Sequence, residues 1–324
     1  MSLKNAVAAV KKYKNFLITS HMSLEGDALG SEIAFYILIK KLGKRGLIVN
    51  EDGTPYGYEF LPKLGAIRRY KNKLNVSFDC LAVLDCSGLE RTGQVYTLNK
   101  DNAAVLNIDH HISNEIFGDI NWVEPKTSCC AEMIYKLYKE MHVPIDKEAA
   151  VCMYVGILTD TGSFRYSNTS SSTHQAAAEL LKHDLDVPKI YKNINENVPF
   201  EDMKLLSRIL PAIRLECQGR IAWFQVKQGL LRNKKLSFDL SEHILTFARA
   251  IKGVEVVALF KENLGTKNEI RVNFRSQGKV DVNKIAQMFG GGGHKAASGA
   301  TIKGQIDTVR RKVVAKIREA VDKS

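Results

Sequence analysis

Two apolar segments, residues 80–85 (CLAVLD) and 103–109 (AAVLNID), constrain the fold more than any other feature of the sequence. Apolar runs without polar alternation are typical of strands buried on both faces of a parallel sheet. Strand-like runs at 15–20 and 46–50 flank a helical pattern at 28–42. Strands that alternate with helices predict an open α/β sheet with right-handed crossovers. We therefore expect an N-terminal domain with a mainly parallel sheet flanked by helices.

The second half of the chain predicts a separate, smaller α/β domain. The pattern changes near Pro188, after expected helices at 128–141 and 147–160. Two further helical patterns, at 187–197 and 200–210, are separated by Pro199. Later we expect strands at 213–217, 220–226, 255–260 and 269–275, and helices at 241–251, from 282 onward and at 305–322. The expected organisation is a domain at 1–186, a helical linker at 187–212 and a second domain at 213–324.

Composition favours a cytoplasmic protein with anionic ligands. The chain has 324 residues, and its 47 Lys and Arg against 35 Asp and Glu give a formal charge of +12. Such a charge attracts nucleotides, nucleic acid or acidic membrane. The six cysteines include no CxxC pair, which favours free thiols in a reducing compartment. The longest apolar run, 149–158, is far shorter than the ~20 residues that span a bilayer, so we expect no membrane association.

Carboxylate and imidazole side chains gather at the ends of the predicted strands. In open parallel sheets, ligands bind beyond the carboxyl ends of the strands. Three strand ends carry such residues, and the expected helix at 147–160 ends on a fourth acidic position. A single Asp at a strand end is often only a turn or helix-capping residue, but four coincidences favour a common site. The candidate residues are His21, Glu25, Asp27, Asp85, Asp109, His110, His111 and Asp160.

This mixture of side chains predicts two divalent metal ions. Carboxylates together with imidazoles suit Mn²⁺ or Co²⁺, with Mg²⁺ also compatible, and the absence of thiolates argues against structural zinc. Eight potential ligands are too many for one ion, so we expect two ions that share a bridging carboxylate. Two metals ~3.5–4 Å apart are the usual arrangement for in-line attack on a phosphate ester. A water that bridges them becomes hydroxide at neutral pH.

The ordered motifs resemble those of the DHH/DHHA1 phosphoesterase superfamily. Residues 108–111 (IDHH) resemble its DHH motif, preceded by a segment like its H-x-x-x-D-x-D motif and by a strand-end Asp, and followed by a later Asp. Residues 289–299 (FGGGGHKAASG) resemble the glycine-rich GGGH motif of the DHHA1 domain. Size and layout look most like the nanoRNase and 3′-phosphoadenosine 5′-phosphate phosphatase branch, of the oligoribonuclease A type. The resemblance spans nearly the whole chain.

The resemblance implies a role for each candidate in the metal centre. Asp85 would bridge the two ions. The first ion would be held by His21, Glu25 and Asp85, and the second by Asp27, Asp85, His110 and Asp160. Asp109 would orient the neighbouring imidazole, and His111 would assist the leaving oxygen or stabilise developing charge.

Glu25 departs from the family pattern, which has Asp at this position. The carboxylate is kept, but one extra methylene moves it by roughly a bond length and adds a rotatable bond. Normal binding, a different mode of chelation and a weakened first metal site are therefore all left open.

A second group of residues is expected to contact substrate. Gly290 to Gly293 interrupt a helical pattern, and we interpret them as an anion-binding loop rather than a flexible linker. Arg275 is similar to the DHHA1 arginine that meets a substrate phosphate, for which a guanidinium is well suited. The candidate substrate contacts are Gly291, Gly292, Gly293, His294 and Arg275, with Arg91 and Arg165 as weaker candidates.

Together these features predict a two-metal phosphoesterase. It would hydrolyse short oligoribonucleotides and 3′-phosphoadenosine 5′-phosphate to nucleoside monophosphates by attack of the metal-bridging hydroxide. The DHH domain would carry the metals, and the DHHA1 domain would recognise the substrate. Two alternatives remain: a cyclic- or linear-dinucleotide phosphodiesterase of the same superfamily, and a non-catalytic nucleotide- or RNA-binding protein. The sequence is also compatible with a homodimer.

Motifs of other enzyme classes are missing. The chain has no GxxxxGK[ST], HExxH or GxSxG motif, and no GxGxxG follows the first strand. The sequence thus gives no support to a P-loop nucleotidase or to a simple dehydrogenase.

Overall fold

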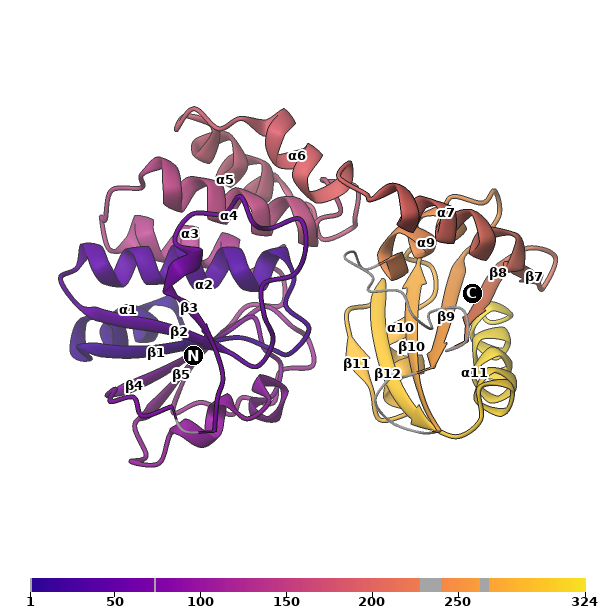
Figure 1. Cartoon of the computed structure of the whole chain (residues 1–324), viewed down its shortest axis with the longest axis horizontal. Helices are drawn as coiled ribbons and strands as arrows, with labels where there is room; N and C mark the ends of the chain where they lie inside the picture. The colour runs from indigo at the N-terminus through magenta and orange to yellow at the C-terminus, as the bar shows by residue number, and fades with distance from the viewer. Residues whose placement is uncertain (1, 73, 228–239, 263–267) are drawn as a thin grey trace. The chain divides into compact units, whose positions relative to one another are not determined.

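The computed structural model describes residues 2–72, 74–227, 240–262 and 268–324. The chain divides into two compact units, Met1–Asn197 and Val198–Ser324 (Figure 1). Each unit contains its own six-stranded sheet. The expected linker at 187–212 contains α6 (Val187–Asn195) and α7 (Phe200–Ile209), which belong to different units. The expected domain boundaries at 186 and 213 stay a prediction.

The sheet of the first unit is parallel throughout, in the order β3-β2-β1-β4-β5-β6. Its central strands are largely apolar, and all of β4 and all of β1 except Asn15 are buried, so they can be covered on both faces. The prediction of a mainly parallel sheet flanked by helices is confirmed. The strands are β1 (Asn15–Thr19), β2 (Arg45–Asn50), β3 (Ile67–Arg69), β4 (Cys80–Leu84), β5 (Ala104–Asp109) and β6 (Ile120–Val123).

Alternate residues of these strands enter two separate cores. Phe16 and Ile18 of β1 share one core with side chains of the α-helices. Leu17, between them, packs with Leu81 and Val83 in a smaller core against η3 (Val95–Leu98) and neighbouring loops. Figure 1 shows α2, α3 and α4 on one side of the strands. The helices of this unit are α1 (Leu3–Lys12), α2 (Gly26–Lys41), α3 (Cys130–Glu140), α4 (Lys147–Asp160), α5 (Ser171–Leu181) and α6.

Helices α2 and α4 touch almost backbone to backbone. A Cβ atom on Gly30 of α2 would collide with the carbonyl oxygen of Cys152 on α4. A Cβ atom on Gly156 of α4 would lie 2.6 Å from Asp27 Oδ1. This close approach brings the first turn of α2 and the last turn of α4 to the same place. The two acidic candidates on these turns, Asp27 and Asp160, are thereby positioned at one end of the sheet.

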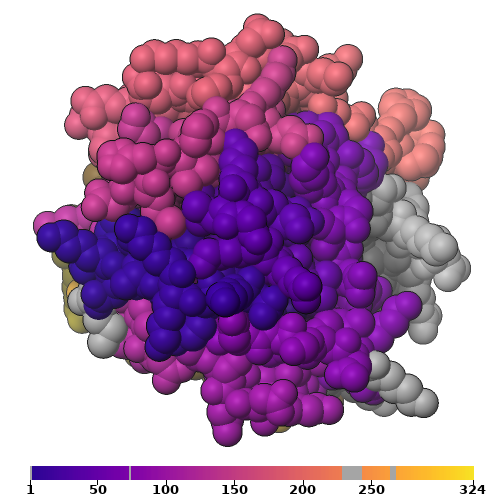
Figure 2. Space-filling view, turned by 90° about the vertical axis from the view of Figure 1, so that its left-hand side faces the viewer, coloured from indigo at the N-terminus to yellow at the C-terminus, as the bar shows by residue number. Residues whose placement is uncertain are grey.

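Surface helices and short segments complete the first unit. The earliest part of the chain, coloured indigo in the space-filling view, lies on the surface of this unit (Figure 2). Its helix α1 buries Ala6, Ala9 and Val10 against the main core. Two further 3₁₀ turns are η1 (Leu64–Ala66) and η2 (Leu89–Thr92). Among the residues that the structure describes, no helix has the length and apolar character needed to cross a bilayer.

The second unit has a mixed sheet in the order β11-β12-β10-β9-β8-β7, in which β8 and β9 are parallel and the other pairs antiparallel. Val256, Ala258 and Phe260 of β9 share a core with α10 and α11. Val257 and Leu259, which point to the opposite face, are also buried, and α9 contacts the same strands.

The second unit therefore has the α/β architecture expected from the sequence. Its strands are β7 (Arg214–Glu216), β8 (Ile221–Val226), β9 (Val256–Glu262), β10 (Glu269–Ser276), β11 (Gly292–Gly293) and β12 (Ala297–Lys303). Its helices are α7, η4 (Leu210–Ala212), α9 (Leu240–Arg249), α10 (Val282–Gln287) and α11 (Ile306–Val321).

Candidate active site

The candidate residues of the first unit meet where the strand order reverses. Strand β1 lies between β2 and β4, so the chain leaves β1 toward one side of the sheet and returns on the other side at β4. Such a point in a parallel sheet opens a crevice beyond the carboxyl ends of the strands. His21 lies two residues beyond β1, and Asp85 directly follows β4. These two side chains therefore lie where the sequence predicts a ligand site.

Asp85 lies at the centre of the site, and its two carboxylate oxygens face different neighbours. Oδ2 is 3.5 Å from His21 Nε2, and Oδ1 is 3.4 Å from His110 Nε2. The backbone of Asp85 has φ +51°, a left-handed conformation that is uncommon and strained for a residue other than glycine. Its N–H donates to the carbonyl oxygen of Ile108 at 3.0 Å, which ties this turn to β5. The strained turn thus directs one buried carboxylate between two imidazoles.

Two sets of donor atoms surround Asp85. In the first set, His21 Nε2 also lies 4.0 Å from Glu25 Oε1. In the second set, His110 Nε2 lies 3.8 Å from Asp27 Oδ2 and 3.7 Å from Asp160 Oδ2. The structure therefore brings together six candidate ligands from the first unit: His21, Glu25, Asp27, Asp85, His110 and Asp160.

The spacing and chemistry of these donors fit divalent metal ions. Distances of 3.4–4.0 Å exceed those of ordinary hydrogen bonds. Asp85 Oδ1 is buried and has no hydrogen-bond partner among the described residues. Ligand atoms about 2 Å from one shared ion lie roughly 3 Å or more from one another. Carboxylate oxygens and imidazole nitrogens are ligands that Mn²⁺, Co²⁺ or Mg²⁺ accept, so the residues present are compatible with the expected metals.

Mutual repulsion among the carboxylates gives them unusual protonation behaviour. Burial and the negative charge of Asp85 raise the pKa of Glu25 to about 7, and the same two causes raise the pKa of Asp27. Burial alone would raise the pKa of Asp85, but His110 and His21 outweigh it and hold that pKa well below its usual value. Burial lowers the pKa of His110, yet Asp160 and Asp85 raise it overall. Binding of a divalent cation here would replace protons held by the cluster.

The ring of His21 is oriented by the backbone. His21 Nδ1 lies 2.7 Å from the carbonyl oxygen of Met22, which can only accept a hydrogen bond. The Nδ1 atom must therefore carry a proton, and in the neutral ring the Nε2 lone pair is directed toward Asp85 and Glu25. A backbone carbonyl that fixes the tautomer in this way is typical of metal-binding histidines. The Met22 N–H in turn donates to the carbonyl oxygen of Arg91 at 2.7 Å.

Asp27 is oriented by the start of helix α3. The Cys130 N–H donates to Asp27 Oδ2 at 2.7 Å, and the Ala131 N–H donates to Oδ1 at 2.8 Å. The first N–H groups of a helix have no partner within the helix and carry partial positive charge. Ser31 Oγ adds a third hydrogen bond to Oδ1 at 3.2 Å. Asp27 is thus fixed by three contacts before any metal binds.

Glu25 has a structural role besides its place in the first donor set. It is the N-cap of α2: Oε1 accepts from the Ala28 N–H at 2.8 Å, and Oε2 accepts from the Asp27 N–H at 3.0 Å. A carboxylate oxygen has two lone pairs. Capping the helix and contacting a cation near His21 are therefore compatible.

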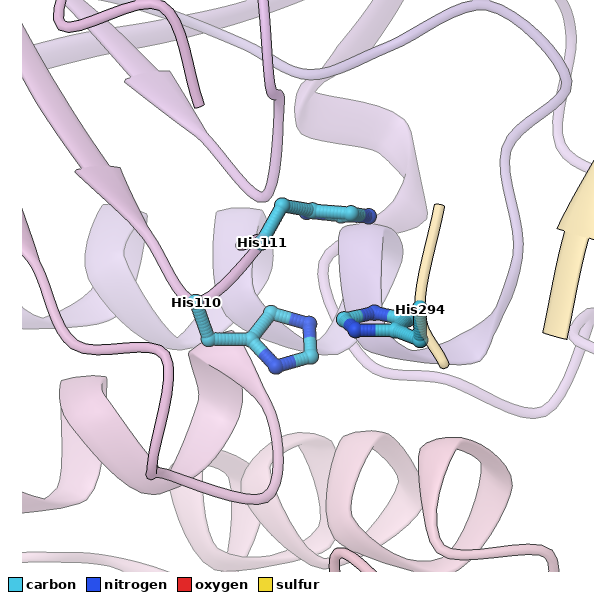
Figure 3. Close-up of side chains that lie close together, drawn as sticks. All are labelled: His110, His111 and His294. Atoms are coloured by element: carbon cyan, nitrogen blue, oxygen red, sulfur yellow. The ribbon is translucent and has the colours of Figure 1, made fainter. Parts of the chain in front are cut away.

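Asp109 holds the second histidine of the DHH sequence. His110 and His111 both extend from the turn that follows β5, with ring centroids 4.9 Å apart (Figure 3). His111 Nδ1 lies 2.7 Å from Asp109 Oδ1, and Asn114 Nδ2 donates to the other oxygen of Asp109 at 2.6 Å. Burial raises the pKa of Asp109, but the neighbouring His111 outweighs it and lowers the pKa overall. The imidazole that Asp109 orients is therefore that of His111.

Three asparagines that the sequence reasoning missed support the site: Asn50, Asn114 and Asn168. Asn168 Nδ2 donates to Asp160 Oδ2 at 3.3 Å and to the carbonyl oxygen of Ser128 at 2.8 Å. Asn50 Nδ2 donates to the buried Glu32 Oε2 at 2.8 Å, and Asn50 Oδ1 accepts weakly from the Ser20 N–H at 3.4 Å. Asn50 could have been found by the same signal as Asp85, because it ends an apolar strand (RGLIVN).

The arginine candidates have different surroundings. Arg91 Nη1 donates to Ser87 Oγ at 3.0 Å. Burial and the Arg91 charge both act to lower the pKa of His21, but Asp85 raises it overall, so Arg91 lies beside the donor sets. Arg165 is exposed, and its Nε donates to the carbonyl oxygen of Gly162 at 2.6 Å. Arg275 is half-buried in β10 of the second unit, where its Nη1 donates to the carbonyl oxygen of Phe274 at 2.9 Å.

The glycine-rich segment forms the edge of the second sheet. Gly292 and Gly293 make up β11 and pair with Gly299 and Ser298 of β12. A Cβ atom on Gly291 would collide with the carbonyl oxygen of Gly299, so this residue has to be glycine for packing alone. His294 follows, and its N–H donates to the carbonyl oxygen of Ala297 at 2.7 Å. Contact of Gly291, Gly292, Gly293 and His294 with substrate stays a prediction.

The chain matches two protein-family models and several known proteins. The family model for the N-terminal domain of the DHH family matches residues 15–157, and the DHHA1 domain model matches residues 228–323. The chain is 30% identical to the bifunctional oligoribonuclease and PAP phosphatase NrnA of Thermus thermophilus, over 95% of this chain and 90% of that protein. It is 27% identical to the Bacillus subtilis protein of the same name, over 91% and 92%.

A solved structure shares the fold over the full length. The crystal structure of an exopolyphosphatase-related protein from Bacteroides fragilis superposes with a TM-score of 0.85 at 24% identity, and covers 99% of this chain and 95% of that one. Both family models and the relatives bear out the resemblance noted in the sequence. The chain therefore belongs to the DHH/DHHA1 phosphoesterase superfamily.

Proposed function

We propose that this protein hydrolyses phosphoester bonds of short oligoribonucleotides and of 3′-phosphoadenosine 5′-phosphate, and releases nucleoside monophosphates. The observation that carries the proposal is the position of Asp85, whose two oxygens lie 3.5 Å and 3.4 Å from imidazoles of two different donor sets. One carboxylate between two donor sets is what a pair of bridged cations requires. The substrates are those named for relatives that match this chain over nearly its whole length.

Two divalent cations, of which Mn²⁺ is the one we favour over Mg²⁺ and Co²⁺, would occupy the two donor sets. His21, Glu25 and Asp85 would hold one, and the other would be held by Asp85 together with Asp27, His110 and Asp160. When bound, such a pair supplies an activated water and neutralises charge on the phosphoryl oxygens.

His111 and Asp109 would handle the proton on the leaving oxygen. Asp109 accepts a hydrogen bond from the Nδ1–H of His111, so Nε2 remains available to hold or donate a proton. Asp109 is fully buried, and its contact with Nδ1 fixes the orientation of the ring. Asn114 keeps Asp109 in place from the other side.

The second unit would supply substrate recognition. Arg275 carries a guanidinium on β10, a group suited to bidentate contact with phosphate. The glycine strand β11 offers backbone without side chains next to it, which would let a nucleotide approach closely. Arg275, Gly291, Gly292, Gly293 and His294 are the proposed contacts, with Arg91 and Arg165 as further candidates on the first unit.

The proposed compartment is the cytoplasm. All six cysteines are free thiols, and five of them are buried. Buried thiols without disulfides are typical of proteins that work in a reducing environment.

A product assay tests the proposal directly. Purified protein is incubated with oligoribonucleotides of two to five nucleotides, 3′-phosphoadenosine 5′-phosphate and a cyclic dinucleotide, each with Mn²⁺, Mg²⁺, Co²⁺ or EDTA. We expect nucleoside monophosphates from the short oligoribonucleotides and from 3′-phosphoadenosine 5′-phosphate with Mn²⁺, and none with EDTA. Intact substrates under every metal condition would refute hydrolysis and favour a protein that only binds nucleotides. Preferred cleavage of the cyclic compound would instead favour a dinucleotide phosphodiesterase.

A further inference from the structure

The net positive charge of this protein comes from its second unit. Of the 47 Lys and Arg residues, 23 lie in residues 1–197 and 24 in residues 198–324; of the 35 Asp and Glu residues, 23 and 12 lie in these ranges. The first unit is therefore neutral, and the second carries the whole formal charge of +12. Charge concentrated on one unit attracts a polyanion to that unit in particular.

One face of the second sheet collects several of these charges. Strand β10 alternates strictly, with Ile270, Val272 and Phe274 buried on one side. Its other side carries Arg271, Asn273 and Arg275, of which Arg271 is exposed. The neighbouring positions on β12 are small: Ala297, Gly299 and Thr301. Side chains of β10 on this face consequently have only small neighbours on the β12 side, whereas on the β9 side Val257 and Leu259 are buried and α9 contacts both strands.

Arg271 has like charge directly across the sheet. Lys261 of β9 is its partner in the β9–β10 register, so two cations lie opposite each other on the same face. Like charges in directly opposed positions destabilise a sheet. The acidic residue of β10 on this face, Glu269, lies opposite another cation, Lys303 of β12. On the part of this face formed by β9, β10 and β12, the cations Lys261, Arg271, Arg275 and Lys303 therefore outnumber the acidic Glu269.

The side chain of Arg271 is held over β12. Its Nη1 donates to Thr301 Oγ1 at 3.2 Å, and a Cβ atom on Gly299 would lie 3.1 Å from its Nη2. Gly299 is also the residue that pairs with Gly292 of β11. The guanidinium of Arg271 therefore lies across β12 toward the glycine strand, where the small residue at 299 makes room for it.

Arg271 and Arg275 are well separated along the strand. Four residues of a strand span ~13 Å between Cα atoms. The Arg275 guanidinium is anchored to its own strand through Phe274, and that of Arg271 is anchored to Thr301. Two guanidiniums held in this way are placed for different phosphates of one ligand.

We propose that Arg271 binds a second phosphate of an oligoribonucleotide, beyond the one assigned to Arg275, and so favours substrates of several nucleotides. This inference rests on the proposed function and specifies its substrate selectivity. A mononucleotide such as 3′-phosphoadenosine 5′-phosphate does not extend to Arg271. A chain of three or more nucleotides does.

The experiment compares Arg271→Ala with the wild type on a pentaribonucleotide and on 3′-phosphoadenosine 5′-phosphate, both with Mn²⁺. We expect KM for the pentanucleotide to rise about tenfold, as for loss of one charged hydrogen-bonding contact, and kinetics on 3′-phosphoadenosine 5′-phosphate to stay within about twofold. The slope of log K against log salt for the pentanucleotide should fall by about 0.7, as for one lost contact with a single strand. Arg311→Ala, an exposed arginine of α11 in the same unit, is the matched control and should leave KM for both substrates unchanged.

Three results would overturn the inference. The first is an equal effect of Arg271→Ala on both substrates, the second is no effect on the pentanucleotide, and the third is an equal effect of Arg311→Ala. Thermal melts of each variant establish that it is folded. Failure of the proposed function itself looks different, because the wild type would then hydrolyse neither substrate.

Discussion

Gly156 of α4 packs directly on Asp27 of α2: a Cβ atom at position 156 would lie 2.6 Å from Asp27 Oδ1. The absence of a side chain on one helix is therefore a condition for the position of a candidate metal ligand on the next helix. The same Cβ atom would collide with Ala131 at the start of α3, where the N–H groups that orient Asp27 are found.

Gly156→Ala should weaken metal binding because it displaces the Asp27 carboxylate. Overpacking of this kind costs about 1–3 kcal/mol of stability, and we expect Mn²⁺ affinity to fall by about tenfold or more. Mn²⁺ titration followed by electron paramagnetic resonance measures the affinity. Gly65→Ala is the control and should match the wild type. A Cβ atom at this position would have no neighbour within 4 Å, and its φ lies outside the left-handed region. Unchanged affinity in Gly156→Ala would show that Asp27 does not contribute to metal binding.

Asp85 and Glu25 should respond very differently to substitution. Asp85→Ala removes the carboxylate that lies between the imidazoles of His21 and His110 and should abolish hydrolysis. Glu25→Asp keeps a carboxylate and a good helix N-cap, so activity should stay within about tenfold of the wild type. Initial rates on a short oligoribonucleotide with Mn²⁺ measure both, and Asp101→Asn, an exposed site, serves as control. Substantial activity in Asp85→Ala would remove the bridging role.

Asn168 should act as a positioning residue for Asp160. Its amide donates to Asp160 Oδ2 and to the carbonyl oxygen of Ser128, and loss of such outer contacts typically lowers metal affinity by about 10- to 100-fold. We expect Asn168→Ala to weaken Mn²⁺ binding in this range while kcat at saturating Mn²⁺ recovers most of its value. A purely structural defect would instead lower kcat at every Mn²⁺ concentration. Asn5→Ala, on the exposed side of α1, is the matched control.

Glu32 should make the metal-free protein less stable as pH rises. Burial raises its pKa from 4.5 to about 8 in the folded protein. The unfolded chain releases this proton near pH 4.5 while the folded chain keeps it until about pH 8. The free energy of unfolding therefore falls across this window, with an upper limit of about 5 kcal/mol from this residue.

Glu32→Gln removes this ionisable group and tests whether it lowers stability as pH rises. In EDTA, the Tm of Glu32→Gln should exceed that of the wild type at pH 9, and the difference should shrink or reverse at pH 5, because the amide resembles the neutral acid. Thermal melts by circular dichroism at the two pH values measure the difference. Glu140→Gln, at an exposed position of α3, should show no such pH dependence. A larger advantage at pH 5 than at pH 9 would contradict the assignment.

The central strands of the first unit could be predicted because their residues are apolar on both faces. Residues 80–84 form β4 and residues 104–109 form β5, close to the expected ranges. Strand β6 (INWV) was missed because it has only four residues and two of them are not fully buried, so no period stands out. Strand β12 (ASGATIK) was missed since small and polar residues dominate it, and its place depends on pairing with β10. Helix α5 was also missed, although the sequence contains a usable signal for its start, the capping box formed by Ser170 and Thr173.

The candidate ligands could be found from sequence because each follows an element whose end is marked by a change from apolar to polar residues. Their supporting contacts could not be found in this way. The Asp27 carboxylate is oriented by N–H groups about a hundred residues away in α3, and Asp160 is oriented by Asn168 in a loop. Such contacts depend on how helices pack, which local sequence patterns do not encode. The close approach of α2 and α4 at Gly30 and Gly156 is another contact that depends on helix packing.

At position 85 the residue that best fits the left-handed backbone differs from the residue that activity requires. Glycine adopts φ near +51° without steric penalty, so Asp85→Gly would relax the turn after β4 but remove the carboxylate that lies between His21 and His110. A laboratory selection for thermostability alone would tend to accept that replacement and lose the enzyme. Variant libraries that are selected for thermostability should therefore keep aspartate at position 85.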